Sequence, residues 1–151
     1  MQAMNTQTQP ANNYSLNDKW GEALDSGFVV IPAVMLRYQH KIEIGDGELV
    51  VLMNLMMQWW KVDEFPFTRA STIAKRMGVS ARTVQRHIER LEEKKLIKRF
   101  YTPERTSAYR ATTQYDLSGI VAKLKDLGVV VGIPARRSSN STSSNSSEEI
   151  K

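Results

Sequence analysis

The chain has 151 residues, a length typical of one domain with flanking segments. Its hydrophobic fraction of 41% and charged fraction of 25% are those of an ordinary soluble globular protein. The chain contains no cysteine, which excludes a disulfide framework, cysteine metal ligands and thiol nucleophiles.

Neither a signal segment nor a membrane span is evident. Residues 1–13 are mostly polar, without the basic and then apolar pattern of a secretory signal. The most apolar stretch, residues 49–60, is shorter than the roughly 20 apolar residues that cross a bilayer. We therefore expect a cytoplasmic protein that makes no membrane contact and needs no cofactor and no metal.

The net charge of +5 is concentrated in one segment. Residues 69–110 contain 12 basic and 4 acidic side chains, whereas residues 1–68 contain 4 basic and 8 acidic ones. A local positive field of this kind attracts a polyanion, although a merely solvated basic face has the same charge density.

Segments of low complexity flank the predicted domain. Residues 1–19 are rich in Gln, Asn and Thr, and residues 138–147 consist only of Ser, Thr and Asn. Such segments bury too little apolar surface to offset the entropy of ordering. We predict one domain over residues 20–131, with disordered tails over residues 1–19 and 132–151.

The first half of the domain is predicted to supply its central packing helix. Residues 28–31 read as a short strand or an extended entry, and Pro32 suits the first turn of a short helix. Asp46 is the expected N-cap of the next helix. The two tryptophans at the end of that helix are expected to pack rather than form a ligand cage. Apolar residues recur at helical spacing, namely Leu49, Leu52, Met53, Met56 and Trp60.

Two helices joined by a tight turn follow. Thr68 is the expected N-cap of a helix over residues 69–77, and Ser80 is the expected N-cap of a helix over residues 81–94. Gly78 lies between them, where the sharp crossing favours a left-handed backbone.

The rest of the domain is predicted to be a hairpin and a final helix. Strand-like runs over residues 96–101 and 108–116 are joined by a loop that contains Pro103. An amphipathic helix over residues 118–127 follows, and residues 129–131 form either a strand or a partner contact.

The helix after Ser80 has two chemically different faces. At about 100° per residue, Val84, Ile88 and Leu91 share the face expected to be buried. The opposite face begins with Arg82, Gln85 and Arg86. Because Arg pairs with guanine and Gln with adenine in the major groove, we predict that these three read DNA bases.

Further polar residues are predicted to contact the DNA backbone. Thr83 is open to a second interpretation, local packing, and His87 is expected to pack. With two histidines and no nucleophile motif or phosphate-binding glycine loop, we predict no catalytic residue and no enzyme activity. The predicted backbone contacts are Ser71, Thr72, Lys75, Thr83, Lys98, Arg99 and Arg110, with Arg105 at the tip of the hairpin.

The segment 71–99, S-T-I-A-K-R-M-G-V-S-A-R-T-V-Q-R-H-I-E-R-L-E-E-K-K-L-I-K-R, resembles winged helix-turn-helix domains of bacteria, phages and plasmids. The resemblance implies a mainly α fold with a small β-hairpin wing and binding to double-stranded DNA. It also implies a recognition-helix role for Arg82, Thr83, Gln85 and Arg86, and a wing role for Arg105.

The flanks, F-V-V-I-P and Q-Y-D-L, extend the resemblance over residues 27–118 to small helix-turn-helix domains of phage and plasmid replication proteins. That resemblance implies a binder of origin or operator DNA. Because a short helix and a serine-rich tail follow the wing, we expect a stand-alone transcriptional regulator of a mobile element or chromosome. A replication initiation or accessory protein and a protein-interaction module, contacting replication or transcription proteins, remain alternatives. A homodimer is also left open.

Overall fold

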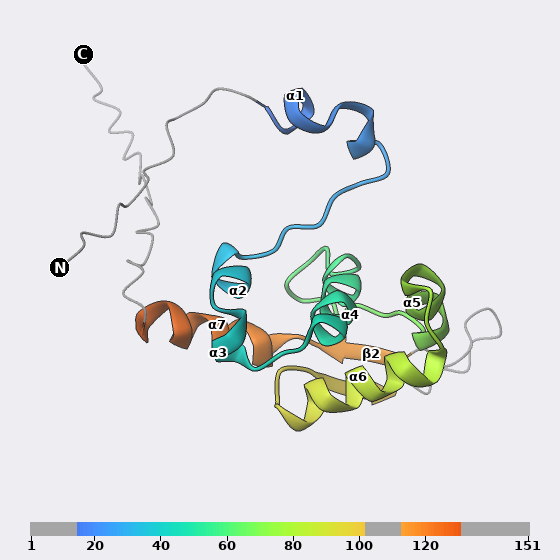
Figure 1. The fold of residues 1–151 in the computed structure, drawn as a ribbon, viewed down its shortest axis with the longest axis vertical. Coiled ribbons are helices and arrows are strands. Elements are labelled where there is room, and N and C mark those ends of the chain that lie inside the picture. Colours follow the sequence, from blue (N-terminus) through green and yellow to red (C-terminus); the bar gives the residue numbers. More distant parts are fainter. Residues whose placement is uncertain (1–14, 102–112, 131–151) are drawn as a thin grey trace, which may run out of the picture.

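The computed structural model describes residues 15–101 and 113–130, which Figure 1 shows as a coloured ribbon. As predicted, the described chain is mainly helical with an antiparallel hairpin, and none of its helices is long and apolar enough to cross a membrane. Its elements are α1 (Leu16–Trp20), the 3-10 helix η1 (Gly21–Leu24), α2 (Ala33–Arg37), α3 (Gln39–Ile42), α4 (Asp46–Met56), α5 (Ala70–Met77), α6 (Ala81–Glu93), β1 (Lys98–Tyr101), β2 (Thr113–Asp116) and α7 (Ser118–Val130).

The hydrophobic core forms where the apolar faces of α2, α4, α5, α6 and α7 meet. Helix α4 contacts both α5 and α6 and lies at the centre of this group in Figure 1, as its apolar pattern predicts. Burial of apolar surface at about 25 cal/mol per Å² is the main force that holds these helices together. Eight core side chains are completely buried: Met35, Val51, Leu52, Leu55, Ile73, Val84, Leu91 and Ile120.

Helix α4 differs from its prediction at both ends. Its N-cap is Gly45, so the prediction that Asp46 caps this helix is wrong by one residue. The helix ends at Met56, and Trp60, which lies beyond it, is 74% exposed rather than packed. Val51 and Leu55 are buried outside the predicted stripe, because other helices cover α4 on more than one side.

The turn between α5 and α6 has the predicted geometry. Gly78 adopts the left-handed conformation, with φ 68° and ψ 30°, which glycine reaches without a steric penalty. Ser80 caps α6 as predicted, since its Oγ accepts a hydrogen bond from the Thr83 amide at 3.1 Å. The N-cap of α5 is Arg69, so the prediction of Thr68 as the cap is wrong; Thr68 is buried instead.

Strands β1 and β2 form the wing hairpin, with Lys98 opposite Asp116 and Tyr101 opposite Thr113. Strand β1 begins two residues later than predicted, at Lys98, because residues 96–97 belong to the buried core. The predicted start of the second strand, at residue 108, lies outside the described residues. The loop with Pro103 and Arg105, and the position of Arg110, lie outside the described residues.

The segment before α5 is tied to this hairpin. Phe67 forms an isolated antiparallel bridge with Gln114, and the Tyr115 amide donates to the Pro66 carbonyl at 3.0 Å. The Phe65 ring lies edge-on to Phe100 with ring centres 4.8 Å apart. The wing is therefore attached to the loop that precedes the helix-turn-helix pair.

Two predictions at the ends of the domain are corrected. Residues 16–19 belong to helix α1, although we predicted that the disordered tail reaches residue 19; a capping box between Ser15 and Asp18 begins this helix. Helix α7 continues to Val130, so the strand predicted for residues 129–131 is wrong for its first two residues. Residues 27–32 run without regular structure, which agrees with the extended-entry interpretation of 28–31. The rest of both predicted tails lies outside the described residues.

Helix α7 packs closely on the chain that leaves α6. The Ile120 amide donates to the Leu96 carbonyl at 2.7 Å. A Cβ placed on Gly119 would lie 2.2 Å from the Lys95 carbonyl oxygen, a distance at which the backbone must move. A side chain at Gly119 is therefore incompatible with this packing.

We predict that Gly119→Ala lowers the free energy of unfolding by about 1–3 kcal/mol, because overpacking against backbone forces the elements apart. Urea denaturation measures the change. Gly128→Ala in the same helix is the matched control, since a Cβ there meets no atom within 4 Å. That control should be neutral or stabilising by up to about 1 kcal/mol. Equal effects of the two substitutions would contradict the close packing.

Candidate nucleic-acid interface

Helix α6 separates a buried apolar face from an exposed polar face. Val84, Ile88 and Leu91 are 0%, 1% and 0% exposed. With these three side chains fixed inward, the helical rotation of about 100° per residue directs Arg82, Gln85 and Arg86 outward. All three are exposed. Their spacing on one face is what reading of neighbouring bases requires.

The amino-terminal end of α6 is held by local contacts. The turn at Gly78 and the cap at Ser80 satisfy backbone groups that would otherwise lack partners, and such a cap contributes about 1 kcal/mol. The Thr83 hydroxyl lies 2.9 Å from the Ser80 Oγ. Thr83 therefore makes a local hydrogen bond at the start of α6, and its phosphate contact stays a prediction.

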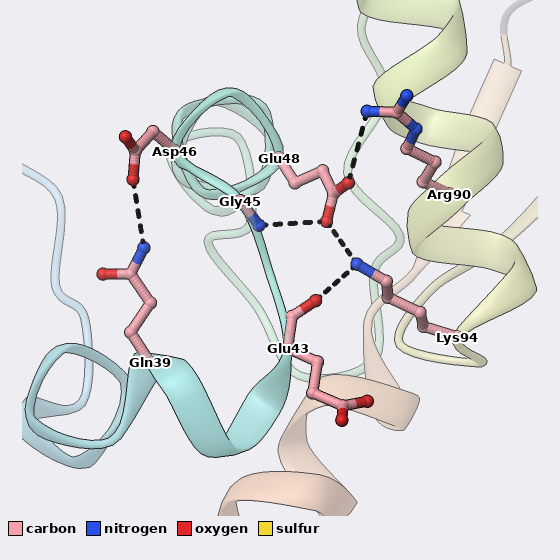
Figure 2. A network of polar contacts seen from close by, with 7 residues as sticks. All are labelled: Gln39, Glu43, Gly45, Asp46, Glu48, Arg90 and Lys94. Carbon is pink, nitrogen blue, oxygen red and sulfur yellow. Dashed lines mark hydrogen bonds and ion pairs between the residues drawn. The ribbon is translucent and has the colours of Figure 1, made fainter.

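Contacts with distant residues hold the carboxyl-terminal end of α6, as Figure 2 shows. The Lys94 Nζ lies 2.7 Å from Glu48 Oε2 and also donates to the Glu43 carbonyl. The Arg90 Nη1 lies 3.9 Å from Glu48 Oε1. Two cations at this end of α6 therefore meet one carboxylate at the start of α4.

The carboxylate of Glu48 is buried, with the residue 4% exposed. Burial by itself raises the pKa of Glu48, but the hydrogen bonds from Lys94 and from the Gly45 amide, together with the charges of Lys94 and Arg90, outweigh burial and hold the pKa below its ordinary value. The Gly45 bond, at 3.2 Å, also caps the first turn of α4. One side chain thus begins α4 and fixes α6.

His87 lies at the contact between α4 and α6. A Cβ on Gly47 would lie 2.4 Å from the His87 Nε2, so the imidazole ring rests directly on the glycine backbone. The ring is half-buried, as expected for the packing role that the sequence predicts.

The residues predicted to contact the DNA backbone differ in exposure and in whether the fold already pairs them. Ser71, Thr72 and Lys75 lie in the first two turns of α5, and Ser71 and Lys75 are exposed. Lys98 on β1 is also exposed, whereas the Arg99 Nη2 pairs with Glu92 Oε2 at 2.8 Å and so ties the wing to α6. No group of residues suited to holding a metal ion occurs within residues 15–101 and 113–130, the part of the chain that the structure describes.

Sequence analysis missed the contacts that connect the helices. Glu48 follows the N-cap Gly45 by three residues, which is a known capping pattern that the sequence prediction did not use. The Arg76 Nη1 also donates to the Asn54 Oδ1 at 3.3 Å and connects α5 to α4. No local sequence signal indicates such a pairing across 22 residues.

Residues 43–97, which span α4, α5 and α6, match the family model described as a helix-turn-helix domain. These residues form a helix-turn-helix domain. The fold is similar to that of the N-terminal domain of the DnaD protein from Geobacillus kaustophilus HTA426, with a TM-score of 0.50 at 24% sequence identity. The match covers 76% of this chain and 94% of that chain. A search of curated proteins gives no match in sequence.

We predict that Glu48→Gln destabilises the helix-turn-helix domain by about 1–3 kcal/mol at neutral pH, because two cations then lose their charged partner. Since folding lowers the pKa of Glu48, the unfolded chain binds the proton more readily. The contribution of Glu48 is therefore complete above the ordinary value of 4.5 and is lost as the pH falls through the lower folded pKa.

Urea denaturation of the wild type and the variant at pH 7 and at about pH 3 checks this prediction. The difference in stability between the two proteins should shrink at the lower pH. A difference that stays constant would show that the charge of Glu48 contributes nothing.

Proposed function

We propose that the helix-turn-helix domain binds double-stranded DNA and that the exposed face of α6 enters the major groove. The observation that carries this proposal is that the side chains of Arg82, Gln85 and Arg86 are exposed and unpaired within the described residues. All three are exposed, and none of their side chains has a hydrogen bond or ion pair with another described residue. Arg and Gln offer the donor patterns that match guanine and adenine, so these side chains are available to read bases.

The surrounding residues are proposed to hold the DNA backbone. Lys75 on α5 and Lys98 on β1 flank α6 along the chain and are exposed. Contacts to phosphates fix the position of a recognition helix without reading sequence. The proposed set is Ser71, Thr72, Lys75, Thr83, Lys98, Arg99 and Arg110, with Arg105 at the wing tip.

We favour a role in DNA replication over the transcriptional regulation that the sequence predicts. The resemblance of residues 27–118 to phage and plasmid replication proteins supports this choice. The likeness to the N-terminal domain of DnaD, which the chain covers almost completely, adds to it. A replication accessory factor that binds DNA in the cytoplasm without catalysing a reaction is consistent with both the sequence resemblance and the structural likeness. A homodimer would place two α6 helices on two half-sites.

Loss of the two arginines tests base reading. Arg82→Ala with Arg86→Ala should remove the preference for a cognate site, because each good pair supplies about 1–3 kcal/mol of discrimination. The site is first selected from a random duplex pool and binding is then measured by fluorescence anisotropy. Lys123→Ala, an exposed lysine on α7, should leave the preference intact. Retained discrimination in the double variant would contradict the assignment of α6.

Salt dependence tests the backbone contacts. For the wild type, the logarithm of affinity should fall linearly with the logarithm of salt concentration, by about 0.9 for each neutralised phosphate. Lys75→Ala should weaken binding to all duplexes alike and reduce this slope by about 1. If the wild type binds no duplex even at low salt, the domain is a protein-interaction module instead.

A further inference from the structure

Two carboxylates, Glu89 and Glu93, lie on the same stripe of α6 as the proposed base-reading residues, and Glu89 is the nearer to them. Glu89 is exposed and follows Arg82 by seven residues, which places it within about 20° of Arg82 around the helix and about 10 Å farther along the axis. Gln85 and Arg86 lie on either side of this line. A length of about 10 Å is the rise of about three base pairs of DNA.

The carboxylate of Glu89 is not used by the fold. Within the described residues it has no hydrogen bond or ion pair, although Arg86 precedes it and Arg90 follows it. Arg90 is directed to Glu48 instead, at 3.9 Å. Glu93, one turn farther along α6, is also exposed and unpaired within the described residues, whereas Glu48 and Glu92 each pair with a cation.

An unpaired carboxylate on a DNA-facing surface repels phosphates and so lowers affinity for DNA in general. Such a group improves selectivity when one correct partner removes the penalty and every wrong partner leaves it. In the major groove a carboxylate, which only accepts hydrogen bonds, needs a base that donates. Guanine and thymine present acceptors there, and adenine presents an acceptor beside its amine; cytosine presents its N4 amine.

We propose that Glu89 is a specificity-determining residue that accepts a hydrogen bond from cytosine N4 at one C·G pair of the target. This proposal rests on the proposed DNA-binding function and deepens it. Glu89 selects partly by repulsion: it excludes guanine, thymine and adenine at that position and weakens binding to unrelated duplexes. Arg82, Gln85 and Arg86 supply the attractive contacts on the same stripe.

The test compares sites selected from a random duplex pool by the full chain and by its Glu89→Gln variant. Because glutamine bonds adenine through N6 and N7, the variant should change the preferred base at one position from cytosine to adenine and leave the other positions unchanged. Substituting that one C·G pair should cost the wild type about 5- to 150-fold in affinity. Glu89→Ala should bind all four bases there about equally and bind unrelated duplex more tightly than the wild type.

The control is Glu93→Gln, which removes the same charge one turn farther along α6 and should leave the selected sequence unchanged. Circular dichroism and thermal unfolding confirm that each variant is folded. If the wild type selects a defined site and Glu89→Gln selects the same site, the role of Glu89 is overturned while the DNA-binding function stands. If the wild type selects no site, both are overturned.

Discussion

The structure depends on how helix α6 is fixed against α4. The apolar contact through Val84, Ile88 and Leu91 determines which face of α6 turns inward, and the pairing of Lys94 with Glu48 fixes its far end. Apolar packing is non-directional, whereas a hydrogen bond is directional. The two together give α6 a defined rotation and tilt. The arrangement of the polar face follows from this constraint.

Much of the helix-turn-helix could be predicted because its determinants are local. Gly78 indicates a left-handed turn, Ser80 indicates a helix start, and the period of the apolar residues indicates the inward face of α6. Each signal lies within a few residues of the feature that it determines. Local signals also predict that two strands follow α6 and that α7 begins at Ser118. Exposure of Arg82, Gln85 and Arg86 follows directly from the inward face; their contacts with bases stay predictions.

Features that depend on distant residues could not be predicted in this way. Glu48 meets Lys94 across 46 residues of sequence, and no local pattern indicates this pair. Trp60 fits the apolar period of α4, yet the helix ends before it and the side chain is exposed. Thr68 is a better capping residue type than Arg69, yet Thr68 is buried and the helix begins after Arg69. In each case tertiary packing overrides local preference.

The bridge between Phe67 and Gln114 has a mechanical consequence. A hairpin connected only at its own base can swing independently of the helices beside it. Here the second strand is fastened to the residues that lead into α5, and Arg99 fastens the first strand to α6. A force applied to the wing is therefore transmitted to both helices of the pair. Displacement of the two described strands from the helices would therefore have to break both the bridge between Phe67 and Gln114 and the ion pair between Arg99 and Glu92.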